Sequence, residues 1–435
     1  MKEFKIGILG CGTIGTGVAK LLLERQELLS ARVGAKLTLH RVADLDTTRD
    51  RGIIFPPGVF IDDAFKVVDD PEIDIIVEMI GGETFAKQVI LRAIENGKHI
   101  VTANKALIAS HGNEILGAAA QKSVNVEFEA AVGGCMPIIK TMREALVANN
   151  ILSMTGILNG TCNYILSRIT EDGSTFEDAL KTAQELGFAE ADPTLDVGGY
   201  DTAHKLAILT AMAYGMEINL ADIHVEGITA IRPIDIEFAR QFGYRLKLLA
   251  ISKNNGSSVE ARIHPTMIPE GHLLSSVNGS LNAINVNGDA VQDILLYGHG
   301  AGMLPTASAV VSDIADIARN LMTGGTGRVP ALSYQTKEIK KVPVLPIEET
   351  VTRYYIRFAA KDRPGVLSKI SGILGECGIS LQSVHQTEQK SNGTVPVVML
   401  SHMAVEAQVQ KALDQIATLD VIGDKPVMIR IEDLA

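Results

Sequence analysis

The stretch KIGILGCGTIGTGVAKLLL, residues 5–23, decides the fold of the first third of the chain. A short apolar run, Lys5 to Leu9, predicts a strand, and the apolar spacing after it predicts a helix over Gly15–Leu29. The glycines between them permit a tight turn and close approach of the backbone to a pyrophosphate, which the helix N-terminus would attract. The stretch therefore predicts a dinucleotide site, whose residues are Gly10, Gly12, Thr13, Ile14 and Gly15.

Strand and helix patterns continue to alternate after this motif. Further strands are predicted at 37–43, 73–79, 99–102 and 124–128, and a helix at 85–96. Apolar strands that alternate with helices indicate a parallel doubly wound sheet. We therefore expect a Rossmann-type dinucleotide-binding domain over residues 1–137, completed by residues 303–325.

The choice of dinucleotide depends on the end of the second predicted strand. Asp44 stands there and is placed to bind a ribose hydroxyl, although it follows Gly15 at a longer interval than the usual spacing of about 20 residues. Arg41, Arg49 and Arg51 are alternatives for a 2′-phosphate, or merely solvated. Both NAD and NADP stay open.

The remaining sequence predicts two more folded units. Residues 138–302 mix helices, at 137–148, 161–171, 175–187 and 201–215, with strands at 151–158 and 246–252, as in an α+β substrate-binding and dimerisation domain. Residues 326–350 carry Gly, Pro and Lys without periodicity and are predicted to be a linker. Residues 351–435 follow the order βαββαβ of a ferredoxin-like unit.

Composition narrows the class of protein. The formal net charge of −11 and the lack of a basic cluster argue against nucleic-acid binding. No long apolar run or secretory leader is apparent, which argues against a membrane protein. The four cysteines are far apart, as expected for free thiols in a reducing compartment. The cytoplasm is the expected location.

Two lysines are candidates for catalysis. Lys105 ends the motif TANK at 102–105, at the carboxyl end of a predicted parallel strand, where open α/β sheets bind ligands. The segment AQELGFAEADPTLDVGGYDTAHK, residues 183–205, places Asp201 and Lys205 four apart on one helix face. A buried Lys can exchange a proton with a carbonyl oxygen near neutral pH, and carboxylates suit an ammonium-bearing substrate. A surface ion pair on a capping loop is the alternative.

These motifs resemble the homoserine dehydrogenase family over about residues 1–325. The Gly-rich N-terminus, TANK, EAAVGGCMP at 129–137, LNGTCNYIL at 158–166 and GHGAGMLPTASAVVSDI at 298–314 occur in the family's order, with the 183–205 segment among them. The resemblance implies reversible NAD(P)-linked oxidation of L-homoserine to L-aspartate 4-semialdehyde, in threonine, methionine and isoleucine biosynthesis.

The resemblance also implies roles for single residues. Lys205 matches the proton donor and acceptor, and Lys105 the lysine near cofactor and reacting carbon. The substrate-binding positions are Glu190, Asp201 and Asp196. Gly187 and Gly302 match positions near the nicotinamide nucleotide. A sodium ion held largely by backbone carbonyls is implied at Glu129, Val132, Gly134 and Met136, although a plain Gly-rich turn explains that segment equally well.

The C-terminal unit resembles the ACT domain of amino-acid-regulated enzymes. The similarity rests on DRPGVL at 362–367 and on CGI at 377–379. A turn before a helix offers amides to a ligand carboxylate, and the resemblance implies L-threonine as effector and a homo-oligomer, dimer or tetramer. A pairing module without ligand is the alternative. The expected effector residues are Asp362, Gly365, Val366, Leu367 and Ile379.

Two other functions are alternatives to this interpretation. An aldehyde dehydrogenase would use Cys162 as nucleophile, but no His base stands near it in the sequence, and His204 and His299 are interpreted as structural. A nucleotide-binding amino-acid sensor would not need Lys105 and Lys205, and both are present.

Overall fold

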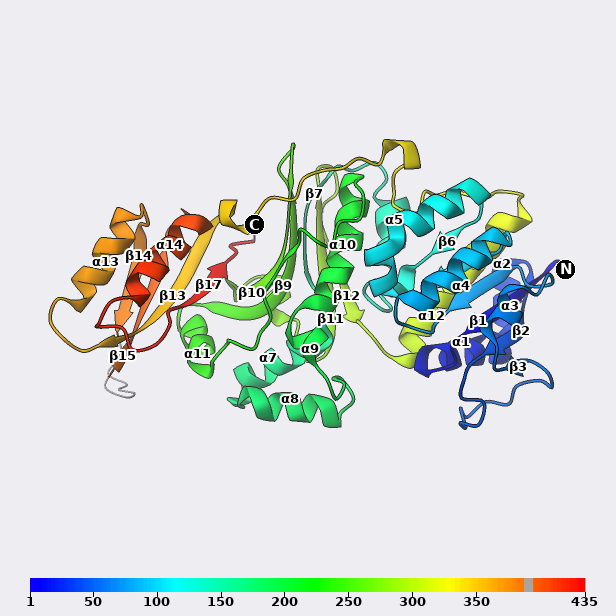
Figure 1. Ribbon diagram of the computed structural model, residues 1–435, viewed down its shortest axis with the longest axis horizontal. Coiled ribbons are helices and arrows are strands. Elements are labelled where there is room, and N and C mark those ends of the chain that lie inside the picture. The colour runs from blue at the N-terminus through cyan, green and yellow to red at the C-terminus, as the bar shows by residue number, and fades with distance from the viewer. Residues whose placement is uncertain (387–393, 435) are drawn as a thin grey trace.

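A computed structural model describes residues 1–386 and 394–434 of the chain. The N-terminal sheet domain lies at one end of an elongated molecule and the C-terminal βαββαβ unit at the other, with the second sheet between them (Figure 1). No helix among the described residues combines the length and the apolar character needed to cross a membrane.

The N-terminal domain is the predicted parallel doubly wound sheet. Its strand order is β3-β2-β1-β4-β5-β6, and every neighbouring pair is parallel. Ile6 and Ile8 of β1 are fully buried, which explains the unbroken apolar run in the sequence. The strands are β1 (Glu3–Leu9), β2 (Lys36–Ala43), β3 (Phe60–Ile61), β4 (Ile75–Glu78), β5 (His99–Thr102) and β6 (Val126–Glu127).

Helices cover both faces of this sheet. Helix α12 (Met303–Met322), far along the chain, returns to pack on α1 (Thr13–Glu24). A Cβ on Gly17 would lie 2.9 Å from the backbone of Met303, so this close packing needs glycine. The others are α2 (Gln26–Val33), α3 (Ala64–Val68), α4 (Thr84–Glu95) and α5 (Lys105–Lys122).

Two predicted helices differ from the structure. The helix expected over Gly15–Leu29 breaks at Arg25, whose φ of −116° leaves the helical region between α1 and α2. The apolar stripe ends just before that point, at Leu23. The helix expected over 137–148 is a short turn, α6 (Ile138–Lys140), followed by a π-helical turn. This wider turn brings Arg143 to the buried carboxylate of Glu127, at 2.6 Å.

The middle region forms a mixed sheet with more strands than the two predicted. Strands β11 and β12 were not predicted, because Asn and Gly interrupt the alternation of apolar and polar residues that marks a strand. The strands are β7 (Ile151–Ile157), β8 (His224–Val225), β9 (Tyr244–Asn254), β10 (Val259–Pro269), β11 (Leu281–Gly288) and β12 (Gln292–His299). The helices are α7 (Gly160–Asp172), α8 (Phe176–Glu185), α9 (Thr194–Val197), α10 (Tyr200–Tyr214) and α11 (Pro233–Gln241).

The C-terminal unit has the predicted βαββαβ order and the strand order β17-β13-β15-β14. Its sheet does not stand alone, because β17 pairs in parallel with β10 and the two sheets run on as one of eleven strands. The segment before it, 323–350, contains only short turns and isolated bridges. The elements are β13 (Val351–Lys361), α13 (Val366–Glu376), β14 (Leu381–Gln386), β15 (Thr394–Ser401), β16 (Ala404–Val405), α14 (Glu406–Ala417) and β17 (Val427–Ile431).

Buried polar contacts fasten this unit to the middle region. Asp235 of α11, fully buried, accepts hydrogen bonds from Arg357 Nε at 2.6 Å and from Tyr355 Oη at 2.9 Å. Both donors lie on β13. Helix α11 therefore covers the sheet face opposite to α13 and α14, and the C-terminal unit packs directly on the middle region.

Candidate functional site

The glycine turn after β1 has the shape that phosphate binding requires. Gly10 has a φ of +88°, and a Cβ on Gly15 would lie 2.0 Å from the carbonyl oxygen of Gly10. Nothing lies within 4 Å of a Cβ placed on Gly12, so the turn is open on the side that a dinucleotide would approach. Thr13, Ile14 and Gly15 begin α1, whose first amides face this opening. The residues present therefore fit the predicted dinucleotide.

Asp44 lies against the same turn. Its Oδ2 accepts a hydrogen bond from the Cys11 amide at 2.5 Å, and its Oδ1 lies 3.5 Å from Arg51. Arg51 also donates to the Cys11 carbonyl oxygen at 2.8 Å and stacks on the ring of Phe60. Of the three arginines considered for a 2′-phosphate, the structure brings Arg51 to the glycine turn, beside the expected ribose position.

Lys105 is held at the start of α5 by a network at the ends of β4 and β5. Buried Glu78 accepts a hydrogen bond from Thr102 Oγ1 at 2.7 Å. Asn104 caps α5 by accepting from the Leu107 amide at 3.1 Å and donates to the Gly82 carbonyl oxygen. The sequence motif TANK is thus explained, since Thr102 and Asn104 fix where the Lys105 side chain leaves the sheet edge.

One buried carboxylate joins the two candidate lysines. Asp201 Oδ2 accepts from Lys205 Nζ at 2.7 Å, and its Oδ1 lies 3.0 Å from Lys105 Nζ. Lys205 Nζ also donates to the Leu158 carbonyl oxygen at 2.6 Å. Lys105 belongs to the dinucleotide-binding domain and Asp201 to α10, and α5 and α10 pack side by side where these regions meet (Figure 1). The site therefore lies between cofactor and substrate domains.

Asn159, at the end of β7, organises the carboxylates, although the sequence reasoning assigned it no role. Its Nδ2 donates to Asp201 Oδ2 at 2.9 Å and to Asp196 Oδ1 at 2.7 Å. Its Oδ1 accepts from the Cys162 amide and so caps α7. Thr161 Oγ1 donates to the other oxygen of Asp196 at 3.3 Å. An Asn just before a helix is a cap signal, which could have marked this residue.

The charges of this cluster are strongly perturbed. Burial opposes ionisation of Asp201, but Lys205 and Lys105 together hold the pKa of its carboxyl well below the usual value. Burial lowers the pKa of the Lys205 ammonium, Asp201 opposes that effect, and the charge of Lys105 reinforces it. The Asp201 charge raises the pKa of Lys105. Lys205 is therefore the lysine that gives up its proton more readily.

The remaining predicted substrate and nicotinamide residues differ from Asp201 in their burial and position. Glu190 is exposed, and its charge contributes to the raised pKa of Lys105. Asp196 is partly buried, and burial raises the pKa of its carboxyl. Gly187 and Gly302 both have positive φ, at +76° and +127°. Gly187 follows α8 and Gly302 caps α12, so both lie in turns rather than in the carboxylate cluster itself.

Cys162 is unsuited to nucleophilic attack. Its side chain is buried, its Sγ donates to the Asp196 carbonyl oxygen at 3.1 Å, and burial raises the pKa of its thiol well above the usual value. His299 is exposed and its carbonyl oxygen accepts from the Cys135 amide. Burial lowers the pKa of His204. The thiol chemistry considered from the sequence therefore has no support here.

The segment expected to hold a cation is a tight buried turn. The Glu129 carboxylate accepts from the amides of Ile139 and Lys140, both at 2.9 Å. Gly133 and Gly134 follow with φ of +72° and +60°, and Val132 and Met136 are buried. Because the Glu129 side chain is engaged, an ion at this turn would have to be bound through backbone oxygens, as the resemblance implies.

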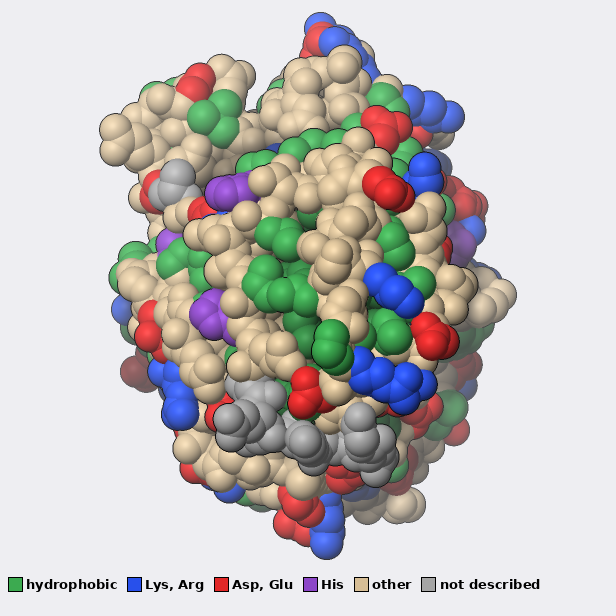
Figure 2. Space-filling model, turned by 90° about the vertical axis from the view of Figure 1, so that its left-hand side faces the viewer, with side chains coloured by type: hydrophobic (Ala, Val, Ile, Leu, Met, Phe, Trp, Pro, Cys, Tyr) green, Lys and Arg blue, Asp and Glu red, His purple; other side chains and the backbone are tan. Residues whose placement is uncertain are grey.

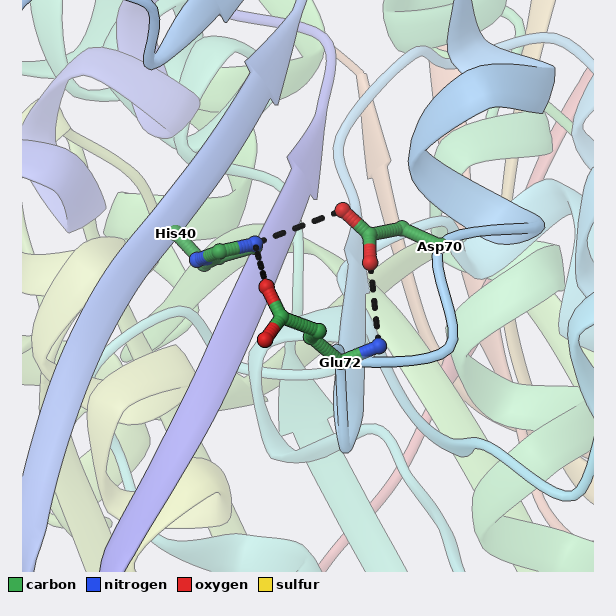
Figure 3. A group of neighbouring side chains, drawn as sticks. All are labelled: His40, Asp70 and Glu72. Atoms are coloured by element: carbon green, nitrogen blue, oxygen red, sulfur yellow. Dashed lines mark hydrogen bonds and ion pairs between the residues drawn. The ribbon is translucent and has the colours of Figure 1, made fainter.

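A second candidate metal group lies elsewhere, among the described residues. His40 Nε2 lies 3.3 Å from Asp70 and 3.5 Å from Glu72, on one side of β2 (Figure 3). Lys5 contacts Glu72 at 3.0 Å and Arg41 lies 3.9 Å from Asp70. These two cations already balance the carboxylates, so we interpret the group as an ion-pair cluster.

The predicted effector residues divide between surface and core. Asp362, Gly365 and Leu367 are exposed around the start of α13, and Gly365 caps this helix with a φ of +85°. Val366 and Ile379 are buried in the core of the C-terminal unit. The first three are therefore accessible to a ligand. Val366 and Ile379 do not reach the surface and can only hold the turn in place from the core.

Comparison with known proteins identifies the family. Models described as "Homoserine dehydrogenase", as its NAD binding domain and as the ACT domain match residues 137–315, 10–129 and 354–420. A homoserine dehydrogenase of Neisseria gonorrhoeae is 45% identical, and the match covers all of both chains. The chain belongs to the homoserine dehydrogenase family.

Solved structures of the family share its fold. The homoserine dehydrogenase from Thiobacillus denitrificans is 44% identical and has a TM-score of 0.95 over 100% of this chain and 99% of its own. A hyperthermophilic archaeal homoserine dehydrogenase in complex with NADPH is 25% identical, with a TM-score of 0.62, over 72% of this chain and 97% of its own. The chain is therefore an oxidoreductase of this family, with an NAD-binding domain and an ACT domain.

The site geometry predicts a shift in pH dependence for Asp201→Asn. Loss of this carboxylate removes the charge that favours the Lys205 ammonium, so the pKa of Lys205 should fall further. The rise of log kcat/KM with pH during homoserine oxidation should therefore move to lower pH, even though the rate itself drops. Asp192→Asn, in the loop before α9 and bound to Thr194, is the matched control and should not move this profile. An unmoved or raised profile for Asp201→Asn would contradict the assignment.

Proposed function

We propose that Lys205 is the general base for oxidation of the L-homoserine hydroxyl to the aldehyde of L-aspartate 4-semialdehyde. The main support is the buried carboxylate of Asp201, whose oxygens lie 2.7 Å from Lys205 Nζ and 3.0 Å from Lys105 Nζ. When bound, NAD(P) supplies the hydride acceptor. The carbinol C–H electrons leave as hydride, and the hydroxyl proton passes to Lys205 Nζ, so that C=O forms. In the reverse direction Lys205 returns the proton.

The other polar residues are proposed to place the substrate. Glu190 and Asp201 bind its ammonium or hydroxyl group, and Asp196 supports Asp201 through Asn159. Lys105, which lies 3.0 Å from Asp201 and follows β5 at the edge where the parallel strands end, orients the reacting carbon against the cofactor. Lys105 is the hydrogen-bond donor that stabilises negative charge as it develops on the substrate oxygen.

The cofactor is proposed to be NAD or NADP, bound at Gly10 to Gly15 with Gly187 and Gly302 near the nicotinamide. Asp44 supports NAD by its position for a ribose hydroxyl, while Arg51 beside it offers a partner for a 2′-phosphate. The archaeal relative described with NADPH supports the phosphorylated form. A sodium ion bound by backbone oxygens of Glu129, Val132, Gly134 and Met136 is part of the same proposal.

Self-association is proposed through the ACT end of the molecule. Strand β14 is the last in the sheet order, and an unpaired edge is a pairing surface. Hydrophobic side chains gather in the middle of this end face (Figure 2). Leu367 of α13 and Val384 of β14 are 45% and 41% exposed. We propose a dimer or tetramer in the cytoplasm, built in part by pairing of ACT domains.

Threonine is the proposed effector of the ACT domain. It is an end product of the biosynthetic route implied by the family, and it differs from homoserine only in the position of its hydroxyl. The exposed turn Asp362–Leu367 presents backbone amides at the start of α13, which suits an amino-acid carboxylate. Inhibition from this distance requires threonine to bind one state of the enzyme better than another, typically by about 1–3 kcal/mol.

Lys205→Ala tests the proposed catalytic base. Turnover should fall by about 100-fold or more, the usual effect of losing a general base, while NAD(P) affinity measured by fluorescence titration stays within about two-fold, because Lys205 contacts Asp201 and Leu158 rather than the glycine turn. Near-normal turnover in this variant would remove Lys205 from its role.

Gly365→Val tests the effector site. The positive φ of Gly365 disfavours any side chain, although the space around it is open, so the variant should distort the turn without disturbing the distant lysines. The threonine concentration for half inhibition should rise by about 10-fold, which lies within the lower part of typical coupling, with unchanged uninhibited turnover. Equal threonine sensitivity in variant and parent would favour competition at the homoserine site.

A further inference from the structure

A buried arginine of the ACT domain makes a double ion pair across the domain junction. Arg430, in β17, is 1% exposed. On one side it binds Glu406 of α14, Nε to Oε2 at 2.9 Å and Nη2 to Oε1 at 2.6 Å. On the other side it binds Glu226 of the catalytic region, at 3.0 and 2.8 Å. Arg430 is therefore the direct ionic link between α14 and the segment after β8.

Glu226 belongs to a segment whose backbone is fastened at both ends. The Glu226 amide donates to the Ile263 carbonyl oxygen of β10 at 2.8 Å. The Ile228 amide donates to the Val197 carbonyl oxygen at 2.9 Å, and Val197 ends α9, next to Asp196. The segment 226–228 thus bridges from the strand that pairs with the ACT domain to the loop that carries the substrate carboxylates.

The 226–228 segment packs closely against residues 197–199, and only glycine fits at position 227. A Cβ on Gly227 would lie 2.1 Å from the Val197 carbonyl oxygen and 2.7 Å from Gly198 Cα. A Cβ on Gly199 would lie 3.0 Å from Val225. Gly199 is the N-cap of α10, and its carbonyl oxygen accepts from the Ala203 amide at 3.0 Å. A displacement of the 226–228 segment must therefore displace the first turn of α10.

The charged groups around Arg430 favour its pairing with Glu226 and Glu406. Burial opposes the charge of Glu226, but His224 and Arg430 hold the pKa of its carboxyl well below the usual value. The neighbouring cation Arg262 is paired separately, with Glu432 at 2.8 Å and Glu260 at 2.9 Å. Loss of Arg430 would leave Glu406, fully buried, without its cation, which favours rearrangement of the junction.

We propose that Arg430 is a positioning residue for homoserine oxidation. By holding Glu226 it keeps the 226–228 segment against Gly198 and Gly199, and so sets where α10 presents Asp201 and Lys205. The ACT domain would then contribute to the geometry of the active site even without an effector. This inference rests on the proposed roles of Asp201 and Lys205.

The test is a kinetic comparison of Arg430→Met, Glu226→Ala and the double variant in the full-length enzyme. Glu226 is half-exposed, so Glu226→Ala should fold and can still test the contact if Arg430→Met does not fold. The matched control is Arg357→Met, which removes another buried pair across the same junction, with Asp235 of α11, and leaves the bonds of the 226–228 segment in place. Each enzyme is assayed for the KM of homoserine, the KM of NAD(P), the pH profile and the melting temperature.

The proposal expects the homoserine KM to rise by about 10-fold in Arg430→Met and in Glu226→Ala, since small misplacements of reacting groups are costly. The NAD(P) KM should stay unchanged, and the double variant should be no worse than Arg430→Met, because both changes break one contact. Arg357→Met should lower the melting temperature without moving the homoserine KM or the pH profile.

Two results would overturn the proposal. One is an unchanged homoserine KM in Glu226→Ala and in any folded Arg430→Met enzyme. The other is an equal rise in Arg357→Met, which would assign the effect to general loosening of the junction. Failure of the proposed function is distinguishable, because Lys205→Ala would then retain turnover whatever these variants show.

Discussion

The structure depends on one buried negative charge, that of Asp201. A carboxylate removed from water is costly unless cations and hydrogen-bond donors surround it, and here Lys205, Lys105 and Asn159 all do so. These partners come from separate parts of the chain, so the charge can be satisfied only when α5, α10 and the end of β7 meet. The same burial weakens the hold of Lys205 on its proton, which links the stability of the junction to the chemistry proposed there.

Each domain helps to position the residues around Asp201. The parallel sheet brings Lys105 to the edge where the glycine turn also opens, so that cofactor and lysine share one side. The second sheet carries Asn159 at the end of β7 and packs α10 beneath it. The ACT domain extends that sheet through β17, and its Arg430 reaches the segment that supports the start of α10. The ACT domain and the region that contains the candidate site are thus parts of one continuous structure.

Much of this could be predicted from the sequence, because the signals are local. The Gly10–Gly15 turn, the apolar parallel strands and the βαββαβ order follow from spacing and periodicity, and the 183–205 segment contains both Asp201 and Lys205. Contacts between distant segments leave no such pattern. The pairing of β17 with β10, the Asn159 bridge and the Arg430–Glu226 contact, 204 positions apart, depend on tertiary packing, and strands β11 and β12 are too polar to register as strands.

A crystal structure of the enzyme with L-homoserine and NAD(P)+ would test the central claim most directly, since it shows which groups touch the reacting atoms. The account predicts the substrate hydroxyl oxygen within about 3 Å of Lys205 Nζ, a normal hydrogen-bond distance, and the ammonium group toward Glu190 and Asp201. A bound homoserine whose hydroxyl lies beyond reach of Lys205, with its ammonium turned away from both carboxylates, would contradict it.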